Sequence, residues 1–194
     1  MNTMFTKLFT ATALVAMVVI PTEASAFRMG GLGNQMRGMF ITERAPTLAP
    51  MGHVRFCMQN PAECRTSTRG GDTVTLDKRR QMVLRAVNTR VNGSIRGRNE
   101  TGDVWQVGGK SGDCEDFALT KRSELIRRGF PASALRIATA RTPRGEGHAV
   151  LMVRTSEGDV VLDNRTNTIK PWNKTDLRWV SIQSTANPRY WKSI

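Results

Sequence analysis

Long apolar runs, aromatic side chains and histidine are all scarce in this chain of 194 residues. The main apolar run, from Leu8 to Ile20, is shorter than the roughly 20 residues that a membrane-spanning helix needs, which disfavours a membrane anchor. It follows Lys7 and is broken by Pro21, and Ala24-Ser25-Ala26 then supplies small residues at cleavage-site spacing. This order is typical of a secretory signal peptide over residues 1–26. We therefore expect a periplasmic or secreted protein that begins at Phe27.

Aromatic side chains that could stack on bases are rare, because the chain has one tyrosine and four tryptophans. The formal net charge is nevertheless +13, which leaves nucleic acid, anionic surfaces and acidic substrates as partners to consider. Much of the positive charge falls at helical spacing, which is typical of a solvated helix face, and no tryptophan lies inside the basic clusters Lys78–Arg80, Lys121-Arg122 and Arg127-Arg128. We therefore expect no nucleic-acid partner.

Cysteine is also scarce, at three residues, so one thiol must stay unpaired in an oxidising compartment. Cys57 and Cys64 flank the turn Asn60-Pro61 and are predicted to form a local disulfide. Two free buried thiols are the alternative at this stage. Cys114 is the remaining cysteine.

The order of the predicted elements indicates an α+β domain. Apolar spacing predicts a helix from Thr75 or Asp77 to near Gly97, with Asn88 and Asn92 on one side of it. A second helix is predicted from the N-cap Asp113 to Gly129. Strands follow at 135–141, 148–155, 159–163 and 179–184, the second and third joined as a hairpin. Residues 27–50 show no periodicity and are predicted to form an irregular arm, which leaves 51–194 as one domain.

Cys114 falls in the first turn of the second predicted helix. Free N–H groups and the helix dipole favour an anion there, which would lower the pKa of the thiol and hold an oxyanion. The small residue Gly112 precedes it and would let a substrate backbone come close.

A cysteine nucleophile needs a base, and the chain offers two histidines, His53 and His148. His53 lies in the irregular segment beside the predicted disulfide. His148 opens a predicted strand, and Asp163 ends the strand paired with it, so both fall at one edge of the hairpin. The sequence therefore predicts Cys114, His148 and Asp163 as nucleophile, base and orienting acid. On these residues alone, the alternative that all three side chains are structural and inert is equally open.

The run from Trp105 to Asn164 resembles the bacterial transglutaminase-like cysteine proteinases, which include the LapG-type periplasmic adhesin proteases. The matching stretches are GDCEDFA at 112–118, GHAVLMV at 147–153 and VLDN at 161–164, with FCMQNPAEC and the Val87-Asn88/Val91-Asn92 pattern in support.

This resemblance implies a papain-like fold in its transglutaminase-like form, with the nucleophile on a helix N-terminus packed against an antiparallel sheet. It implies the Cys114–His148–Asp163 triad, a role for Trp105 in the oxyanion site or groove wall, and Asn164 as the alternative orienter. It also implies an adhesin as the protein substrate and an inner-membrane receptor as the regulator.

Calcium beside the nucleophile is implied by the same resemblance, at Asp113 and Glu115, and no organic cofactor is expected. A physical argument points the same way, because Asp113, Glu115 and Asp116 crowd Cys114 and would oppose its ionisation. Helix capping explains Asp113 and Asp116 without a metal, but it explains Glu115 less well.

The expected function is that of a periplasmic cysteine endopeptidase. A protein-crosslinking transglutaminase is the alternative enzyme, because the same triad transfers an acyl group to an amine. An inactive module that binds anionic surfaces through its basic face is the alternative outside enzymes.

Overall fold

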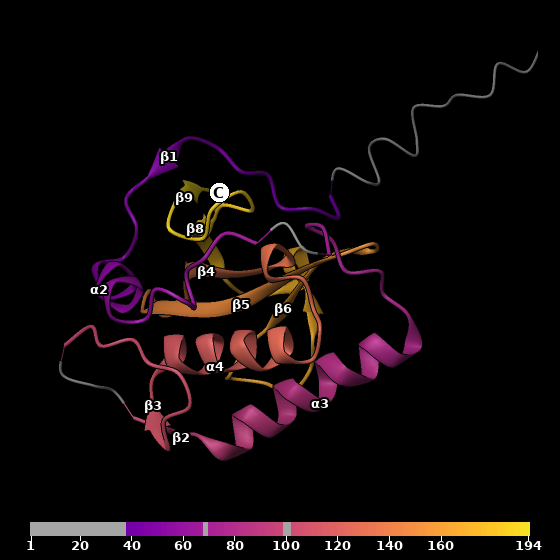
Figure 1. Cartoon of the computed structure of the whole chain (residues 1–194), viewed down its shortest axis with the longest axis horizontal. Coiled ribbons are helices and arrows are strands. Elements are labelled where there is room, and N and C mark those ends of the chain that lie inside the picture. The colour runs from indigo at the N-terminus through magenta and orange to yellow at the C-terminus, as the bar shows by residue number, and fades with distance from the viewer. Residues whose placement is uncertain (1–37, 68–69, 99–101) are drawn as a thin grey trace, which may run out of the picture.

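The computed structural model describes residues 38–67, 70–98 and 102–194 (Figure 1). The predicted signal peptide and residues 27–37 of the predicted arm lie outside these ranges. Within them, no helix is both long and apolar enough to cross a membrane.

An antiparallel sheet forms the centre of the molecule, and it has seven strands within the described ranges. Its order is β1-β9-β8-β4-β5-β6-β7. The strands span Pro46–Thr47 (β1), Leu135–Arg141 (β4), Gly147–Thr155 (β5), Gly158–Leu162 (β6), Lys170–Pro171 (β7), Arg178–Gln183 (β8) and Trp191–Ser193 (β9). A separate parallel pair joins β2 (Arg96–Gly97) to β3 (Ser111–Gly112) and ends two residues before Cys114.

Three α-helices are present in the described residues: α2 (Met51–Gln59), α3 (Lys78–Ser94) and α4 (Cys114–Arg127). Short 3₁₀ turns follow at Ala132–Ala134 and Trp172–Lys174. Helix α4 packs along β5 and β4, and α3 lies on the outer side of α4 (Figure 1). The expected α+β class, with the helix that carries Cys114 packed on an antiparallel sheet, is confirmed.

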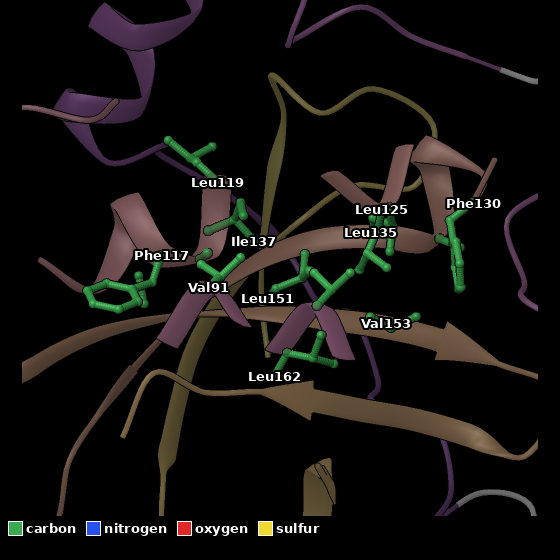
Figure 2. Packing of buried hydrophobic residues seen from close by; sticks show 14 of the residues in the cluster. Val91, Phe117, Leu119, Leu125, Phe130, Leu135, Ile137, Leu151, Val153 and Leu162 are labelled. Carbon is green, nitrogen blue, oxygen red and sulfur yellow. The ribbon is translucent and has the colours of Figure 1, made fainter. Parts of the chain in front are cut away.

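The core lies between α4 and the sheet. Figure 2 shows Phe117, Leu119 and Leu125 of α4 meeting the buried side chains of three strands. Val91 of α3 joins them, and the strand residues include Leu135, Ile137, Leu151, Val153 and Leu162. Burial of these apolar side chains fixes the position of α4, and with it the position of its first residue.

The two main helices begin where the sequence predicts, and α4 also ends there, whereas α3 ends at Ser94, before the expected end near Gly97. Asp77 caps α3, its carboxylate accepting a hydrogen bond from the backbone N–H of Arg80 at 2.7 Å. Helix α4 ends before Gly129, whose φ of +85° lies in the left-handed region that favours glycine after a helix, and Pro131 follows. The predicted strands agree with β4, β5, β6 and β8 to within about one residue at either end.

Several features differ from the predictions, among them the short strands β2, β3, β7 and β9, which no sequence pattern predicts. Helix α2 replaces the irregular segment expected around His53, and its short length, its glycine in the first turn and its missing side-chain cap explain why the sequence pattern was weak. The described part of the predicted arm is also tied to the sheet, because β1 pairs with β9. The side chain of Ile41 in that segment is buried.

Candidate active site

Cys114 is the first residue of α4 and is half-buried. The backbone N–H of Ala149, in β5, donates a hydrogen bond to its sulfur at 3.3 Å. The sulfur therefore lies directly against the start of the strand that carries His148. Cys57 and Cys64 form the expected disulfide, with their Cα atoms 5.5 Å apart, so Cys114 is the free thiol.

His148 and Asp163 meet at one edge of the hairpin formed by β5 and β6. Leu151 of β5 pairs with Leu162 of β6 in an antiparallel register. His148, which precedes Leu151, and Asp163, which follows Leu162, therefore lie toward the same edge of the hairpin. Nε2 of His148 lies 2.9 Å from Oδ1 of Asp163, and both side chains are buried. Since Nε2 is engaged by the carboxylate, Nδ1 is the ring nitrogen that remains for proton exchange with a substrate or thiol.

Arg165 holds the other side of the Asp163 carboxylate. Its Nε and Nη2 donate to Oδ2 at 3.0 and 2.8 Å, and its backbone N–H donates to Oδ1 at 2.9 Å. Asp176 in turn accepts from Nη2 of Arg165 at 2.7 Å. Burial opposes ionisation of Asp163, but the hydrogen bonds from His148 and Arg165 prevail and hold its pKa below the ordinary value. Asp163 is therefore an anion fixed from both sides.

The acids around Cys114 divide into two kinds. Asp116 has a structural partner set, since it accepts from the backbone N–H of Gln106 at 2.8 Å and from that of Asp113 at 3.3 Å. Gly112 leaves the space that Asp116 occupies, because a Cβ at position 112 would collide with that carboxylate. This contact explains Gly112 by packing, where the sequence suggested room for substrate.

Glu115 and Asp113 form the second kind. Oε2 of Glu115 accepts a hydrogen bond from the Cys114 thiol at 3.3 Å. Burial, followed by hydrogen bonding and charge from Asp113, raises the pKa of Glu115 to about 8. Oδ1 of Asp113 is buried and has no hydrogen-bond partner among the described residues.

The thiol pKa moves opposite to the sequence-based expectation. Burial, and then the negative charge of Glu115, raise the pKa of Cys114 to about 12, although the Ala149 N–H favours the anion. The expectation of a lowered pKa rested on the helix start alone. In this structure, desolvation and the adjacent carboxylate outweigh the hydrogen bond from the Ala149 N–H.

Trp105 and Asn164 both line the groove. The indole N–H of Trp105 donates to Oδ1 of Asp103 at 2.7 Å. Asp163, and not Asn164, binds the imidazole of His148.

A groove of about 1040 Å³ lies above Cys114. Its walls come from the end of β4, the start of β5, the loop before α4 and the loop after β6, and they include Trp105, Asp113, Cys114, Glu115, Thr139–Thr142, Glu146–Ala149, Asn164 and Arg165.

His53 is remote from this chemistry. It lies in α2, fully buried, with its ring 5.4 Å from that of Trp105 and 5.2 Å from that of Trp191. Its Nε2 bonds the amide of Gln183 at 2.8 Å, and burial lowers its pKa to about 4. His53 also lies near the sulfurs of Cys57 and Cys64, but their disulfide removes them as metal ligands.

Residues 43–194 match the family model of the bacterial transglutaminase-like cysteine proteinases. The chain belongs to this family. No curated protein gives a significant match.

Three solved structures of LapG from Legionella pneumophila share part of the fold. The calcium-bound form aligns with a TM-score of 0.49 at 26% identity, covering 53% of this chain and 64% of that one. A second form and an EGTA-treated form each align at 0.48 and 28% identity, covering 53% of this chain and 62% of theirs. The aligned part thus spans less than two thirds of the length of each LapG chain.

Sequence reasoning missed Arg165 and the N–H of Ala149. Arg165 follows Asp163 by two residues, and a basic side chain this close to a proposed orienting acid is a signal that could have been used. The Ala149 contact with Cys114 had no signal in the sequence, because it depends on how α4 packs on β5.

Proposed function

We propose that this protein is a cysteine endopeptidase in which Cys114 is the nucleophile, His148 the base and then the acid, and Asp163 the orienting carboxylate. The observation that carries the proposal is the His148–Asp163 hydrogen bond of 2.9 Å, at the edge of a groove that also holds the free thiol. Membership of a cysteine proteinase family supports the reaction type.

The residues act in a defined order. The proton of the Cys114 thiol passes to His148, and the sulfur attacks the carbonyl carbon of the scissile peptide bond. The C–N bond breaks as His148 returns the proton to the leaving amine. Water then attacks the thioester, gives one proton to His148, and releases the carboxylic acid and the thiol.

The start of α4 supports this sequence of steps. Backbone N–H groups in the first turn of a helix have no partner within the helix and can stabilise the negative oxygen of the tetrahedral intermediate. Asp163, held by Arg165, keeps His148 in the tautomer with its proton on Nε2 and stabilises the imidazolium that forms.

Calcium fits the loop before Cys114. The unpartnered Oδ1 of Asp113 and the adjacent carboxylate of Glu115 are oxygen donors of the type that calcium prefers. Asp113 and Glu115 would hold the ion, with backbone carbonyls and water completing about 6–8 oxygens. The bound ion would supply positive charge that offsets the two carboxylates beside the thiol.

The location and partners are part of the same proposal. The N-terminal pattern supports export to the periplasm, and by analogy with LapG-type proteases the substrate is a surface adhesin and the regulator an inner-membrane receptor. Both partners rest on the family resemblance. The basic surface does not identify either one.

Hydrolysis and acyl transfer are separated by the fate of the acyl group. Wild-type protein and Cys114→Ala are incubated with cell-envelope proteins in H₂¹⁸O with a dansylated primary amine present. A peptidase incorporates ¹⁸O into new C-terminal carboxylates, whereas a transglutaminase attaches the dansyl group to glutamine side chains. Absence of both products from wild-type protein, with envelope proteins still bound, would favour the inactive binding module.

A further inference from the structure

Two asparagines of α3, Asn88 fully buried and Asn92 half-buried, bind the backbone of the loop that begins with Asp163. Nδ2 of Asn92 donates to the carbonyl of Asp163 at 3.0 Å and to that of Thr166 at 3.1 Å. Nδ2 of Asn88 donates to the carbonyls of Thr166 and Asn167, both at 3.1 Å. The amide of Asn92 also lies 3.0 Å from Oδ1 of Asn167. Two side chains thus bind three backbone carbonyls of the loop, those of Asp163, Thr166 and Asn167.

This loop has little other support for its carbonyls. Strand β6 ends at Leu162 and β7 begins at Lys170, so residues 163–169 lie between paired strands. The hydrogen bonds within the loop use N–H groups, as when Arg165 and Thr168 donate to the side chains of Asp163 and Thr166. Asn88 and Asn92 of α3 supply hydrogen-bond donors to these partly buried carbonyls.

Helix α3 is itself fixed relative to the helix that carries the nucleophile. Its residues Leu84, Val87 and Val91 are buried in the core. Arg90 forms an ion pair with Glu124 of α4. A hydrogen-bond donor on α3 therefore positions the Asp163 backbone relative to α4, the helix that carries Cys114.

We propose that Asn88 and Asn92 are positioning residues for the active site, with Asn92 the more direct of the two. Resting on the proposed function above, this inference assigns α3 the task of placing the Asp163 carboxylate against His148. Arg165 fixes the carboxylate from the solvent side, and the asparagines fix its backbone from the core side. Neither asparagine touches substrate.

The side-chain type is specific to this task. Oδ1 of each asparagine is buried without a partner in the described ranges, so the amide donors make the identified contacts. Asn92→Asp keeps the shape but replaces the NH₂ donor by an oxygen that faces carbonyls. Asn92→Ala removes the group altogether, and Asn92→Gln retains a donor.

The test follows the ring Nε2–H proton of His148 by ¹H–¹⁵N NMR, which needs no substrate. The chain has two histidines, and His148→Ala assigns the signals. In Asn92→Ala and Asn92→Asp this proton should exchange with water at least about threefold faster, because its hydrogen bond to the Asp163 carboxylate opens more often. Asn92→Gln should restore at least half of the lost protection. The matched control is Thr89→Ala, an exposed change on the outer side of α3, which should leave the exchange rate unchanged.

A double-mutant cycle separates positioning from a general loss of stability. In the Asp163→Ala background, Asn92→Ala should cause no further increase in the exchange rate of the His148 ring proton, because the group through which it acts is gone. The other charged neighbours of Asp163, which are Arg165 and Lys121, are unchanged in all variants. An unchanged exchange rate in folded Asn92→Ala and Asn92→Asp would overturn the proposal, as would an equal increase in the Asp163→Ala background.

Activity provides the second readout. If the peptidase function holds, kcat should fall about tenfold in Asn92→Ala with KM within about twofold, since the loss is confined to the proton-transfer machinery. A wild-type protein without activity would defeat the proposed function and leave the NMR result intact. A rise in KM with unchanged kcat would overturn the positioning role.

Discussion

The thiol of Cys114 donates a hydrogen bond to Oε2 of Glu115, 3.3 Å away. The thiol that must lose its proton is therefore hydrogen-bonded to a carboxylate whose negative charge discourages that loss. Burial, together with this contact, places the pKa of the thiol at about 12, so little thiolate is present near neutral pH.

Replacing Glu115 should make the thiol more reactive. In Glu115→Gln the charge is absent, so the pKa of Cys114 should fall and alkylation by iodoacetamide at pH 9 should accelerate about tenfold for each unit of that fall. The matched control is Glu146→Gln, which removes another acid of the groove wall. Equal rates in wild type and Glu115→Gln would show that Glu115 does not govern the thiol.

Calcium should, like Glu115→Gln, make the thiol of Cys114 more reactive. With calcium present, wild-type protein should melt at a higher temperature and alkylate faster than in EGTA, because binding to the folded state stabilises it and offsets the two carboxylates. Asp113→Ala/Glu115→Ala should show neither change. Identical melting curves and full activity in EGTA would mean that these acids only cap and flank the helix.

Lys121 should make the protein less stable as the pH is lowered from about 10 to 7. It is fully buried, its Nζ has no hydrogen-bond partner among the described residues, and burial lowers its pKa from 10.5 to about 7, the charge of Asp163 opposing the fall. Within that window the unfolded chain binds a proton at Lys121 that the folded protein does not, so lowering the pH favours unfolding.

Lys121→Met should accordingly raise the free energy of unfolding at pH 7.5 by about 1–3 kcal/mol and flatten its pH dependence between 7 and 10. Urea unfolding at several pH values measures both effects. The exposed Lys110→Met is the control and should change neither. A Lys121→Met protein that is less stable than wild type would mean that the ammonium is needed as the partner of Asp163.

The two histidines should respond differently to substitution. His148→Ala should reduce kcat by roughly 10²-fold or more, because it removes the base. For His53→Ala, the buried contacts of His53 with Gln183 and Trp191 predict a lower melting temperature. Its rate per folded molecule should stay close to wild type. Peptide hydrolysis and thermal melting on both variants check this, and inactivation by His53→Ala alone would refute the triad.

The strands and main helices could be predicted because their ends are marked locally. Asp113 and Gly129 bracket α4, and Gly158 turns the hairpin that brings His148 to Asp163. Helix α2 lacked such marks, since it begins after Pro50 without a capping side chain. The placement of Cys114 at a helix start and of His148 beside Asp163 could thus be predicted from the sequence.

The parts that could not be predicted depend on distant contacts. Asn92 and Asp163 are 71 residues apart, so their hydrogen bond has no local pattern. The direction of the thiol pKa was wrong for the same reason, because it is set by burial under the fold and not by the helix start. Asn88 and Asn92 stood out in the sequence only as a pair on one side of a helix.

The central claim is that Cys114 cleaves peptide bonds, and N-terminal proteomics tests it most directly. Envelope proteins are incubated with wild-type protein or with Cys114→Ala, and new N-termini are identified by labelling and mass spectrometry. The account predicts a set of new N-termini with wild type that vanishes with Cys114→Ala, while an active-site thiol probe labels Cys114 in wild type. The same new N-termini in both samples would contradict it.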